Sequence, residues 1–229
     1  MTYLISHIPK TAGTSLCKLV SKFNPDTTFI YSGELALGNP NLNFSMQFRE
    51  SIKPKLIMGH FSYGVHRLLD IEPKYITVLR EPISRVVSLY YYLKNQPDSH
   101  LAPYFKMGIS IDDFILSEIT EMTNNHMCRV IAGIPPEAGM NINDGWLLGL
   151  AIHNIDHHYV LIGLMDQINV FLDSLSKLLN WPSTDYPTEN INYINKKMPD
   201  HKTIELIKEK NLLDMQLYEY VKKSPRDLI

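Results

Sequence analysis

Several side chains near the start of this chain have the types and spacing for chemistry on a phosphate group. Lys10 brings a point charge, and the residues after it, Thr-Ala-Gly-Thr-Ser, add three hydroxyl groups and a glycine that permits close backbone approach. This segment follows the apolar run Tyr3–Ile5, which predicts a buried strand, and precedes apolar residues at helical spacing from Leu16 to Phe23. A strand that turns into a helix through such a loop aims backbone N–H groups and the positive helix end at one point. The segment therefore predicts a phosphate-binding loop.

The same loop departs from the Walker pattern of P-loop nucleotide-binding proteins. That pattern places a lysine directly after a glycine, whereas Lys10 stands three residues before Gly13. The alternative interpretation is an ordinary strand-to-helix turn in which a threonine or serine caps the helix.

A second apolar run, Tyr75–Leu79, predicts another strand, and Arg80 follows it directly. Pro82 suits the first turn of a helix, which places Ser88 about two turns along that helix. Neighbouring strands of an open α/β sheet end at the crevice where ligands bind, so one ligand could contact both loops. The alternatives are a salt bridge at the helix entry for Arg80 and a hydroxyl bonded to its own helix backbone for Ser88.

His60 follows a third apolar run, Leu56–Met58, and is expected at a strand end in the same crevice. An imidazole with a pKa of about 6.5 suits general base work at neutral pH. The alternative is a core histidine whose ring nitrogens are satisfied by the fold.

These segments together resemble a known enzyme family. HIPKTAGTS and LREPISRVVSLYY look like the 5′-phosphosulfate and 3′-phosphate motifs of sulfotransferases that use 3′-phosphoadenosine 5′-phosphosulfate (PAPS). They are most similar to the branch of the heparan sulfate 2-O-sulfotransferases and their bacterial relatives. MGHFSYG, NNHMCRVIAG, VLIGLMDQ and INYINKKMPDHKTIELI also stand in the order found in that family, so the similarity extends along most of the chain.

The resemblance implies a role for each matching residue. Arg80 and Ser88 would bind the 3′-phosphate, which is the group that separates PAPS from ATP. The late loop of the family closes over the nucleotide, and Tyr193, Asn195 and Lys196 stand in that region, where a charged loop without contact to nucleotide is the alternative. The residues that would bind the 5′-phosphosulfate are Lys10, Thr11, Ala12, Gly13, Thr14 and Ser15.

Two catalytic roles are implied in the same way. Lys10 would neutralise the charge that grows on the leaving 5′-phosphate, and His60 matches the base histidine of an HGHxSF segment. Met58 stands where the 2-O-sulfotransferases have an additional histidine, so any helper role of that histidine is absent. Arg129 resembles an arginine near the active site of the family, and its alternative is a helix-surface or interhelix ion pair.

No metal is expected in this reaction. His153, His157 and His158 are close in sequence, but no HExxH pattern or carboxylate partner accompanies them, which favours a surface or helix-end role. Cys17 and Cys128 are too few for a zinc site and are expected to be reduced thiols.

The charge balance limits the acceptor. Lysine and arginine number 22 against 24 acidic residues, so an extended basic groove for a long anionic polysaccharide or for nucleic acid is not expected. A small metabolite or short saccharide fits better, with transfer to oxygen expected and transfer to nitrogen left open. The first strand begins at residue 3 and no apolar run reaches about 18 residues, which predicts a cytoplasmic protein without membrane association. The oligomeric state stays open.

The order of elements predicts an α/β fold with a mainly parallel sheet flanked by helices, in one domain over residues 1–229. Residues 97–107 and 133–143 are expected to be long loops. Strands are expected at 3–7, 28–31, 56–59, 75–79 and 159–163, and helices at 14–23, 82–95, 111–133, 145–156, 167–180 and 201–222.

Three functions are compatible with these observations. The leading one is a PAPS-dependent sulfotransferase. A P-loop-type kinase would need Mg²⁺ and a Walker pair, and a non-catalytic module that binds a bisphosphonucleotide would leave His60 without a role.

Overall fold

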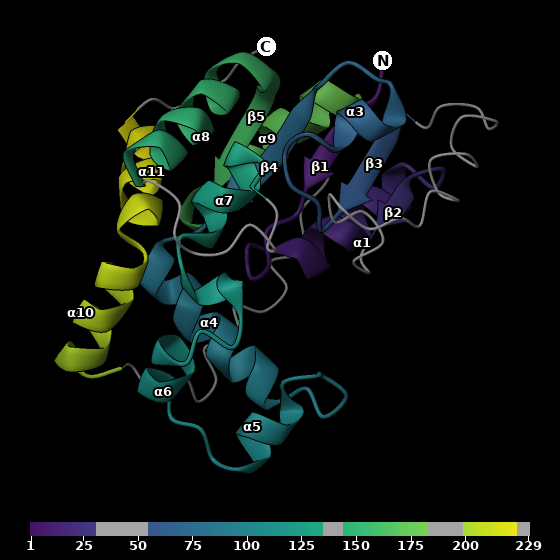
Figure 1. Ribbon diagram of the computed structural model, residues 1–229. Coiled ribbons are helices and arrows are strands. Elements are labelled where there is room, and N and C mark those ends of the chain that lie inside the picture. The colour runs from purple at the N-terminus through teal and green to yellow at the C-terminus, as the bar shows by residue number, and fades with distance from the viewer. Residues whose placement is uncertain (31–54, 135–143, 183–198, 224–229) are drawn as a thin grey trace.

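The computed structural model of the protein describes residues 1–30, 55–134, 144–182 and 199–223 (Figure 1). Its strands are β1 (Tyr3–Ser6), β2 (Thr28–Ile30), β3 (Leu56–Gly59), β4 (Tyr75–Leu79) and β5 (Tyr159–Leu164). They form a five-stranded sheet with the order β2-β3-β1-β4-β5, and every pairing is parallel. The predicted α/β fold class with a parallel sheet is therefore confirmed.

The central position of β1 decides which loops meet. Ile5 of β1 lies beside Met58 of β3 on one side and beside Ile76 of β4 on the other. The chain leaves β1 toward the β2 edge and leaves β4 toward β5, so the connections diverge between β1 and β4. Ligands of open α/β sheets bind beyond the carboxyl ends of the strands at such a point.

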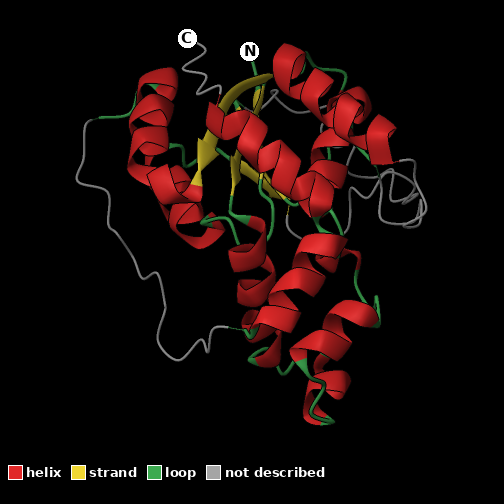
Figure 2. Ribbon diagram, turned by 90° about the vertical axis from the view of Figure 1, so that its left-hand side faces the viewer, coloured by secondary structure: helices red, strands yellow, loops and turns green. Residues whose placement is uncertain are grey.

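Helices cover both faces of the sheet (Figure 2). Side chains alternate along each strand, so Leu4 and Ile5 enter different cores on the two faces. The first core packs under α3 (Val65–Leu69), α7 (His126–Ala132), α8 (Asp144–His158) and α11 (Leu212–Lys223). The second packs under α1 (Gly13–Phe23) and α9 (Ile168–Leu179).

A further group of helices extends beyond the carboxyl ends of the strands, in the lower half of Figures 1 and 2. These helices share an apolar cluster of their own that includes Val86, Phe114 and Ile207. They are α4 (Pro82–Lys94), α5 (Ala102–Lys106), α6 (Ile111–Leu116) and α10 (His201–Lys210). Because α4 starts where β4 ends, this group is anchored beside the expected site. No helix of the described residues has both the length and the apolar character that crossing a membrane requires.

Three of the predicted segments are wrong, and the first two lie between residues 97 and 133. The continuous helix expected at 111–133 is divided into α6, the short 3₁₀ turn η2 (Glu121–Thr123) and α7. Left-handed backbone at Glu118 and Asn125 interrupts the helix, whereas the apolar periodicity of the sequence continues across both residues and gave no sign of a break. The loop expected at 97–107 contains α5, which has a proline in its first turn.

The helix expected at 201–222 is in fact two helices, α10 and α11, that meet at Asn211. The Asn211 side chain is fully buried and donates to the carbonyl oxygens of Thr123 and Ile207, at 2.8 and 2.9 Å. An asparagine amide that bonds to backbone in this way competes with the helix, so the chain turns there. The remaining predicted strands and helices agree with the described elements to within about two residues.

Candidate active site

Three neighbouring strands bring the predicted phosphate and base residues together. The loop after β1 carries Lys10, the residue after β3 is His60, and the residue after β4 is Arg80. The Arg80 guanidinium donates from Nη1 to the carbonyl oxygen of Lys10 at 3.1 Å. The two phosphate-binding segments predicted from the sequence are thus in direct contact, at the point where the connections of the sheet diverge.

The loop backbone is shaped for an anion. Lys10 and Ala12 both adopt left-handed conformations, with φ of 75° and 66°, which is uncommon for residues other than glycine. Ala12 is the N-cap of α1 and provides no side-chain cap, so the first-turn N–H groups of Gly13, Thr14 and Ser15 face the carboxyl end of the sheet. Left-handed residues followed by a helix start can form the concave N–H surface that binds phosphate in other proteins.

The helix α4 carries Ser88 and is contacted by Lys10. The Lys10 ammonium lies 3.9 Å from the centroid of the Tyr92 ring, a cation–π contact. Ser88 stands one helical turn before Tyr92 and is only 3 % exposed. Glu81 caps this helix by accepting from the N–H groups of Ile83 and Ser84, at 3.0 and 2.7 Å. Because residues four apart share a side of a helix, Ser88 lies on the side of α4 that carries Tyr92, the ring that Lys10 contacts.

His60 is paired with a second histidine. Its Nε2 lies 3.1 Å from Nδ1 of His7, and the two ring centroids are 4.8 Å apart. The His60 side chain is exposed on its outer side, so it is not the core histidine of the alternative interpretation. Burial of its inner side lowers the pKa of His60, and burial, His60 and Lys10 lower the pKa of His7 to about 3. Both rings are therefore neutral at pH 7.

The family of the chain is decided by comparison with known proteins. A family model described as the sulfotransferase family matches residues 3–221. The chain belongs to the sulfotransferase family. It is 25 % identical to the heparin sulfate O-sulfotransferase of Drosophila melanogaster over 250 residues, covering 96 % of this chain and 70 % of the relative. The human heparan sulfate 2-O-sulfotransferase 1 is 23 % identical over 248 residues, covering 96 % and 69 %.

A solved structure confirms the fold of this sulfotransferase. The crystal structure of a sulfotransferase from Alicyclobacillus acidocaldarius matches with a TM-score of 0.52 and 13 % identity, over 96 % of this chain and 95 % of that one. The family assignment confirms the predicted enzyme class, a PAPS-dependent sulfotransferase.

Thr11 has a structural position in the loop of the sulfotransferase. It is 1 % exposed, and its hydroxyl donates to the carbonyl oxygen of Ile8 at 2.8 Å. This hydrogen bond of the Thr11 hydroxyl stabilises the turn. The predicted contact of Thr11 with PAPS stays a prediction.

A buried polar cluster behind the site connects α4, α7 and α11. Arg85 and Asp214 are fully buried and 3.8 Å apart, and the Asp214 carboxylate accepts from the N–H groups of Met127 and Cys128 at 3.1 and 2.8 Å. A carboxylate from α11 thus caps the start of α7. Arg129, on the same helix, is 4 % exposed, so the surface ion pair among its alternatives is wrong.

His7 carried no predicted role, although it is the first residue after β1. The available signal was its position, because residues that follow parallel strands face the ligand crevice. Its partner His60 is 53 residues away, and the pairing depends on the sheet register. Tyr193, Asn195 and Lys196 lie outside the described residues, as does most of the loop predicted at 133–143.

The histidines of α8 lie at the opposite end of the sheet. The rings of His153 and His157 stack with centroids 4.2 Å apart, and both are exposed. Within the described ranges, no three histidine, cysteine or acidic side chains are grouped so as to hold a metal ion.

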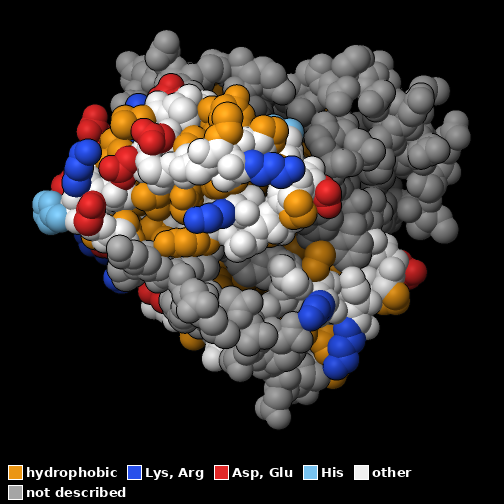
Figure 3. Space-filling view, turned by 90° about the horizontal axis from the view of Figure 1, so that it is seen from below, with side chains coloured by type: hydrophobic (Ala, Val, Ile, Leu, Met, Phe, Trp, Pro, Cys, Tyr) orange, Lys and Arg blue, Asp and Glu red, His pale blue; other side chains and the backbone are white. Residues whose placement is uncertain are grey.

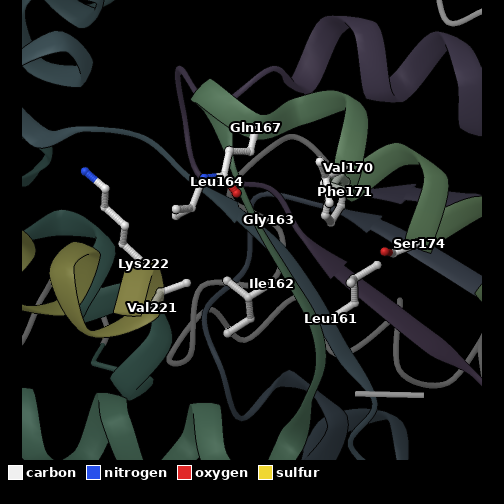
Figure 4. Close-up of a pocket in the computed structure, with 10 residues that line it drawn as sticks. All are labelled: Leu161, Ile162, Gly163, Leu164, Gln167, Val170, Phe171, Ser174, Val221 and Lys222. Carbon is white, nitrogen blue, oxygen red and sulfur yellow. The ribbon is translucent and has the colours of Figure 1, made fainter. Parts of the chain in front are cut away.

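A small pocket also lies apart from the site, between β5, α9 and the end of α11 (Figure 4). It contains none of the predicted site residues. Its walls are formed by Leu161, Ile162, Gly163, Leu164, Gln167, Val170, Phe171, Ser174, Val221 and Lys222.

Proposed function

We propose that this sulfotransferase moves the sulfuryl group of PAPS to a hydroxyl group of a small metabolite or short saccharide. The observation that carries the proposal is the convergence of Lys10, Arg80 and His60 at the ends of three adjacent strands. Each residue comes from a different connection, and the parallel register brings all three to one edge of the sheet.

The donor has two anionic ends, and each has a matching group of residues. The 5′-phosphosulfate would bind the loop from Lys10 to Ser15, supported by the left-handed backbone of Lys10 and Ala12 and the open first turn of α1. The 3′-phosphate would bind Arg80 and Ser88. Arg80 already contacts the phosphate loop through Nη1 and the Lys10 carbonyl, and its guanidinium is a planar fork of N–H donors that matches the oxygens of a phosphate.

The transfer needs a base and a positive charge. His60 would take the proton of the acceptor hydroxyl while the acceptor oxygen bonds to sulfur and the bond from sulfur to the 5′-phosphate oxygen breaks. Lys10 and the N–H groups of α1 would stabilise the charge that develops on that leaving phosphate. The products are a sulfate ester and adenosine 3′,5′-bisphosphate, and the proton on His60 is later released to water.

The acceptor class is supported by charge and by the relatives. The named relatives are heparin or heparan sulfate sulfotransferases, which favours a saccharide. On the face shown in Figure 3, lysine and arginine side chains occur in separate small groups among acidic and hydrophobic ones. An acceptor shorter than a long sulfated polymer fits such a surface. The cytoplasmic location and the single domain over residues 1–229 are part of the same proposal.

Binding and transfer assays test the proposal. Adenosine 3′,5′-bisphosphate should bind without Mg²⁺ and more tightly than ATP, as measured by calorimetry. Purified protein with sulfur-labelled PAPS should then label at least one compound in a panel of hydroxyl compounds and short saccharides. Tight Mg²⁺-dependent binding of ATP would instead support the kinase. Binding of the bisphosphate without transfer to any acceptor would support the non-catalytic module.

A further inference from the structure

The histidine pair at the ends of β1 and β3 indicates how the proposed base is oriented. We infer that His7 is a positioning residue, which accepts a hydrogen bond from Nε2–H of His60 and so keeps the lone pair of His60 on Nδ1. The inference rests on the proposed role of His60 as the base. It adds a residue that the sequence did not point to and specifies the nitrogen that takes the proton.

The contact has hydrogen-bond geometry. His60 Nε2 and His7 Nδ1 are 3.1 Å apart, with the rings tilted by 43°. Between two neutral imidazoles, one nitrogen must donate and the other must accept. The direction of this one hydrogen bond therefore fixes the tautomer of His60.

His7 is held firmly on two sides, as a positioning residue must be. Its backbone N–H donates to the carbonyl oxygen of Gly59 at 2.8 Å, and Gly59 directly precedes His60. Its ring lies against Gly13, where a Cβ atom added to the glycine would fall within the imidazole. Any larger residue at position 13 would displace the ring, so the glycine of the phosphate loop also sets the place of His7.

The groups around the pair keep both rings neutral, so that one ring can donate and the other can accept. Lys10 of the same loop and the His60 ring face His7, and with burial they keep it neutral. Buried His126 of α7 interacts electrostatically with His60, and burial, Arg85, His60 and Arg129 lower its pKa, so it is neutral as well. His60 is the exposed member, so it is the one that an acceptor can reach.

The chemistry of the transfer favours His7 as the hydrogen-bond acceptor. Once His60 has taken a proton, both of its nitrogens carry hydrogen, so Nε2–H can only donate and His7 Nδ1 must accept. If His7 donated in the resting state, the bond would have to reverse during the reaction. With His7 as the hydrogen-bond acceptor, the proton of the substrate hydroxyl goes to Nδ1 of His60. The Nε2–H···Nδ1 bond then stays in place, and no reorganisation is needed.

Three substitutions of His7 test the inference. His7→Asn keeps an amide at the position of Nδ1, His7→Gln places it near Nε2, and His7→Leu removes the acceptor. We expect His7→Asn to keep turnover within about threefold of the unmodified enzyme. His7→Gln and His7→Leu should lower kcat about 10- to 100-fold with little change in the acceptor KM. Affinity for adenosine 3′,5′-bisphosphate and the thermal unfolding midpoint show that the donor loop and fold persist.

The tautomer and the pH profile supply readouts beyond turnover. Long-range ¹H–¹⁵N spectra of the resting enzyme should show His60 protonated at Nε2, and His7→Leu should give a mixture of tautomers. His7→Leu removes the hydrogen-bond acceptor that stabilises protonated His60. The acidic limb of the pH profile of kcat/KM should therefore move to lower pH by about one unit in this variant.

Two results would overturn the inference. One is a resting His60 protonated at Nδ1, and the other is unchanged turnover in both His7→Gln and His7→Leu. The control His60→Ala separates this failure from that of the proposed function. If His60→Ala loses turnover while the His7 variants keep theirs, only the positioning role is wrong. If His60→Ala keeps its turnover, the base assignment is wrong and the inference falls with it.

Discussion

The two ends of the sheet each hold a group of histidines, and they differ in what surrounds them. At the carboxyl end, His7 and His60 directly follow β1 and β3. At the amino end lies a group that we name the amino-end histidines, which come from α3 and α8 and consist of His66, His153, His157 and His158. Close contact between rings is common to both groups, so proximity alone does not identify a catalytic pair.

The direction of the helices separates the two groups. In a parallel sheet the connections leave from the carboxyl ends, so the helix α1 starts beside His7 and His60 with its N–H groups facing them. His157 and His158 instead occupy the last turn of α8, where the helix leaves carbonyl oxygens and not N–H groups without helical partners. His157 Nδ1 donates to the carbonyl oxygen of His153 at 2.8 Å, which satisfies a helix-end carbonyl. The amino-end histidines complete a helix end, whereas the carboxyl-end pair faces an anion-binding loop.

Substitution of one histidine at each end should give the largest contrast. His60→Ala should lower turnover about 100- to 10,000-fold while still binding adenosine 3′,5′-bisphosphate, because a general base typically contributes that much. His157→Ala, which also replaces an exposed histidine, should keep its turnover. Steady-state rates with labelled PAPS measure both. Comparable rates for the two variants would remove the functional difference between the ends.

The charge at the donor loop should have the next largest effect. Lys10→Ala should lower turnover about 100- to 1000-fold, since one preorganised charge at the leaving group is lost. The side chain of Lys10 packs on the surface of Tyr92 and not in a core, so the thermal unfolding midpoint should change little. Lys94→Ala on α4, whose ammonium lies 5.9 Å from the Tyr90 ring, is the matched control and should react normally. Near-normal turnover of Lys10→Ala would contradict the assignment of the loop.

Local patterns predicted the strands and the loop well, because each depends on neighbouring residues. Apolar runs defined β1, β3 and β4, and Pro82 marked the start of α4 correctly. These features together sufficed to bring Lys10, Arg80 and His60 to one edge of the sheet.

What the sequence did not predict depends on distant partners. His7 has a role only beside His60, and the sheet register that joins them is not visible in either segment. The start of α7 is capped by Asp214, 86 residues from Cys128, so the break before this helix had no local capping signal. Left-handed Asn125 marks that break in the structure, whereas the apolar periodicity continued across it.

Substitution of Arg80 should have a smaller effect, which concerns the affinity for nucleotides with and without a 3′-phosphate. Arg80→Ala should weaken adenosine 3′,5′-bisphosphate about 10- to 150-fold, which corresponds to the loss of a charge-assisted hydrogen bond of about 1.5 to 3 kcal/mol. The 3′-dephospho analogue should be affected much less, and calorimetric titration of both ligands measures the ratio. Arg67→Ala, an exposed arginine near the amino-end histidines, is the control and should leave both affinities unchanged. Equal weakening of both ligands by Arg80→Ala would place the 3′-phosphate elsewhere.

The smallest expected effect concerns acid stability at the amino end. His66 contacts the Tyr75 hydroxyl through Nδ1 at 3.0 Å, and burial, Arg67 and His158 lower its pKa to about 4. Between about pH 6.5 and pH 4 the unfolded chain therefore binds a proton that folded His66 does not, so the free energy of unfolding falls as the pH is lowered.

His66→Asn keeps a polar atom at the position of Nδ1 but does not titrate. Between pH 7.5 and pH 5, the free energy of unfolding measured with urea should fall by about 1 kcal/mol less in this variant than in the unmodified protein. The expected difference is small because the His66 ring is partly exposed. Turnover at pH 7.5 should be unchanged, because His66 lies at the end of the sheet that faces away from the donor loop. An equal loss of stability in both proteins would mean that His66 titrates normally in the fold. A fall in turnover would show that the two ends of the sheet are coupled, and the functional separation between the two histidine groups would then be wrong.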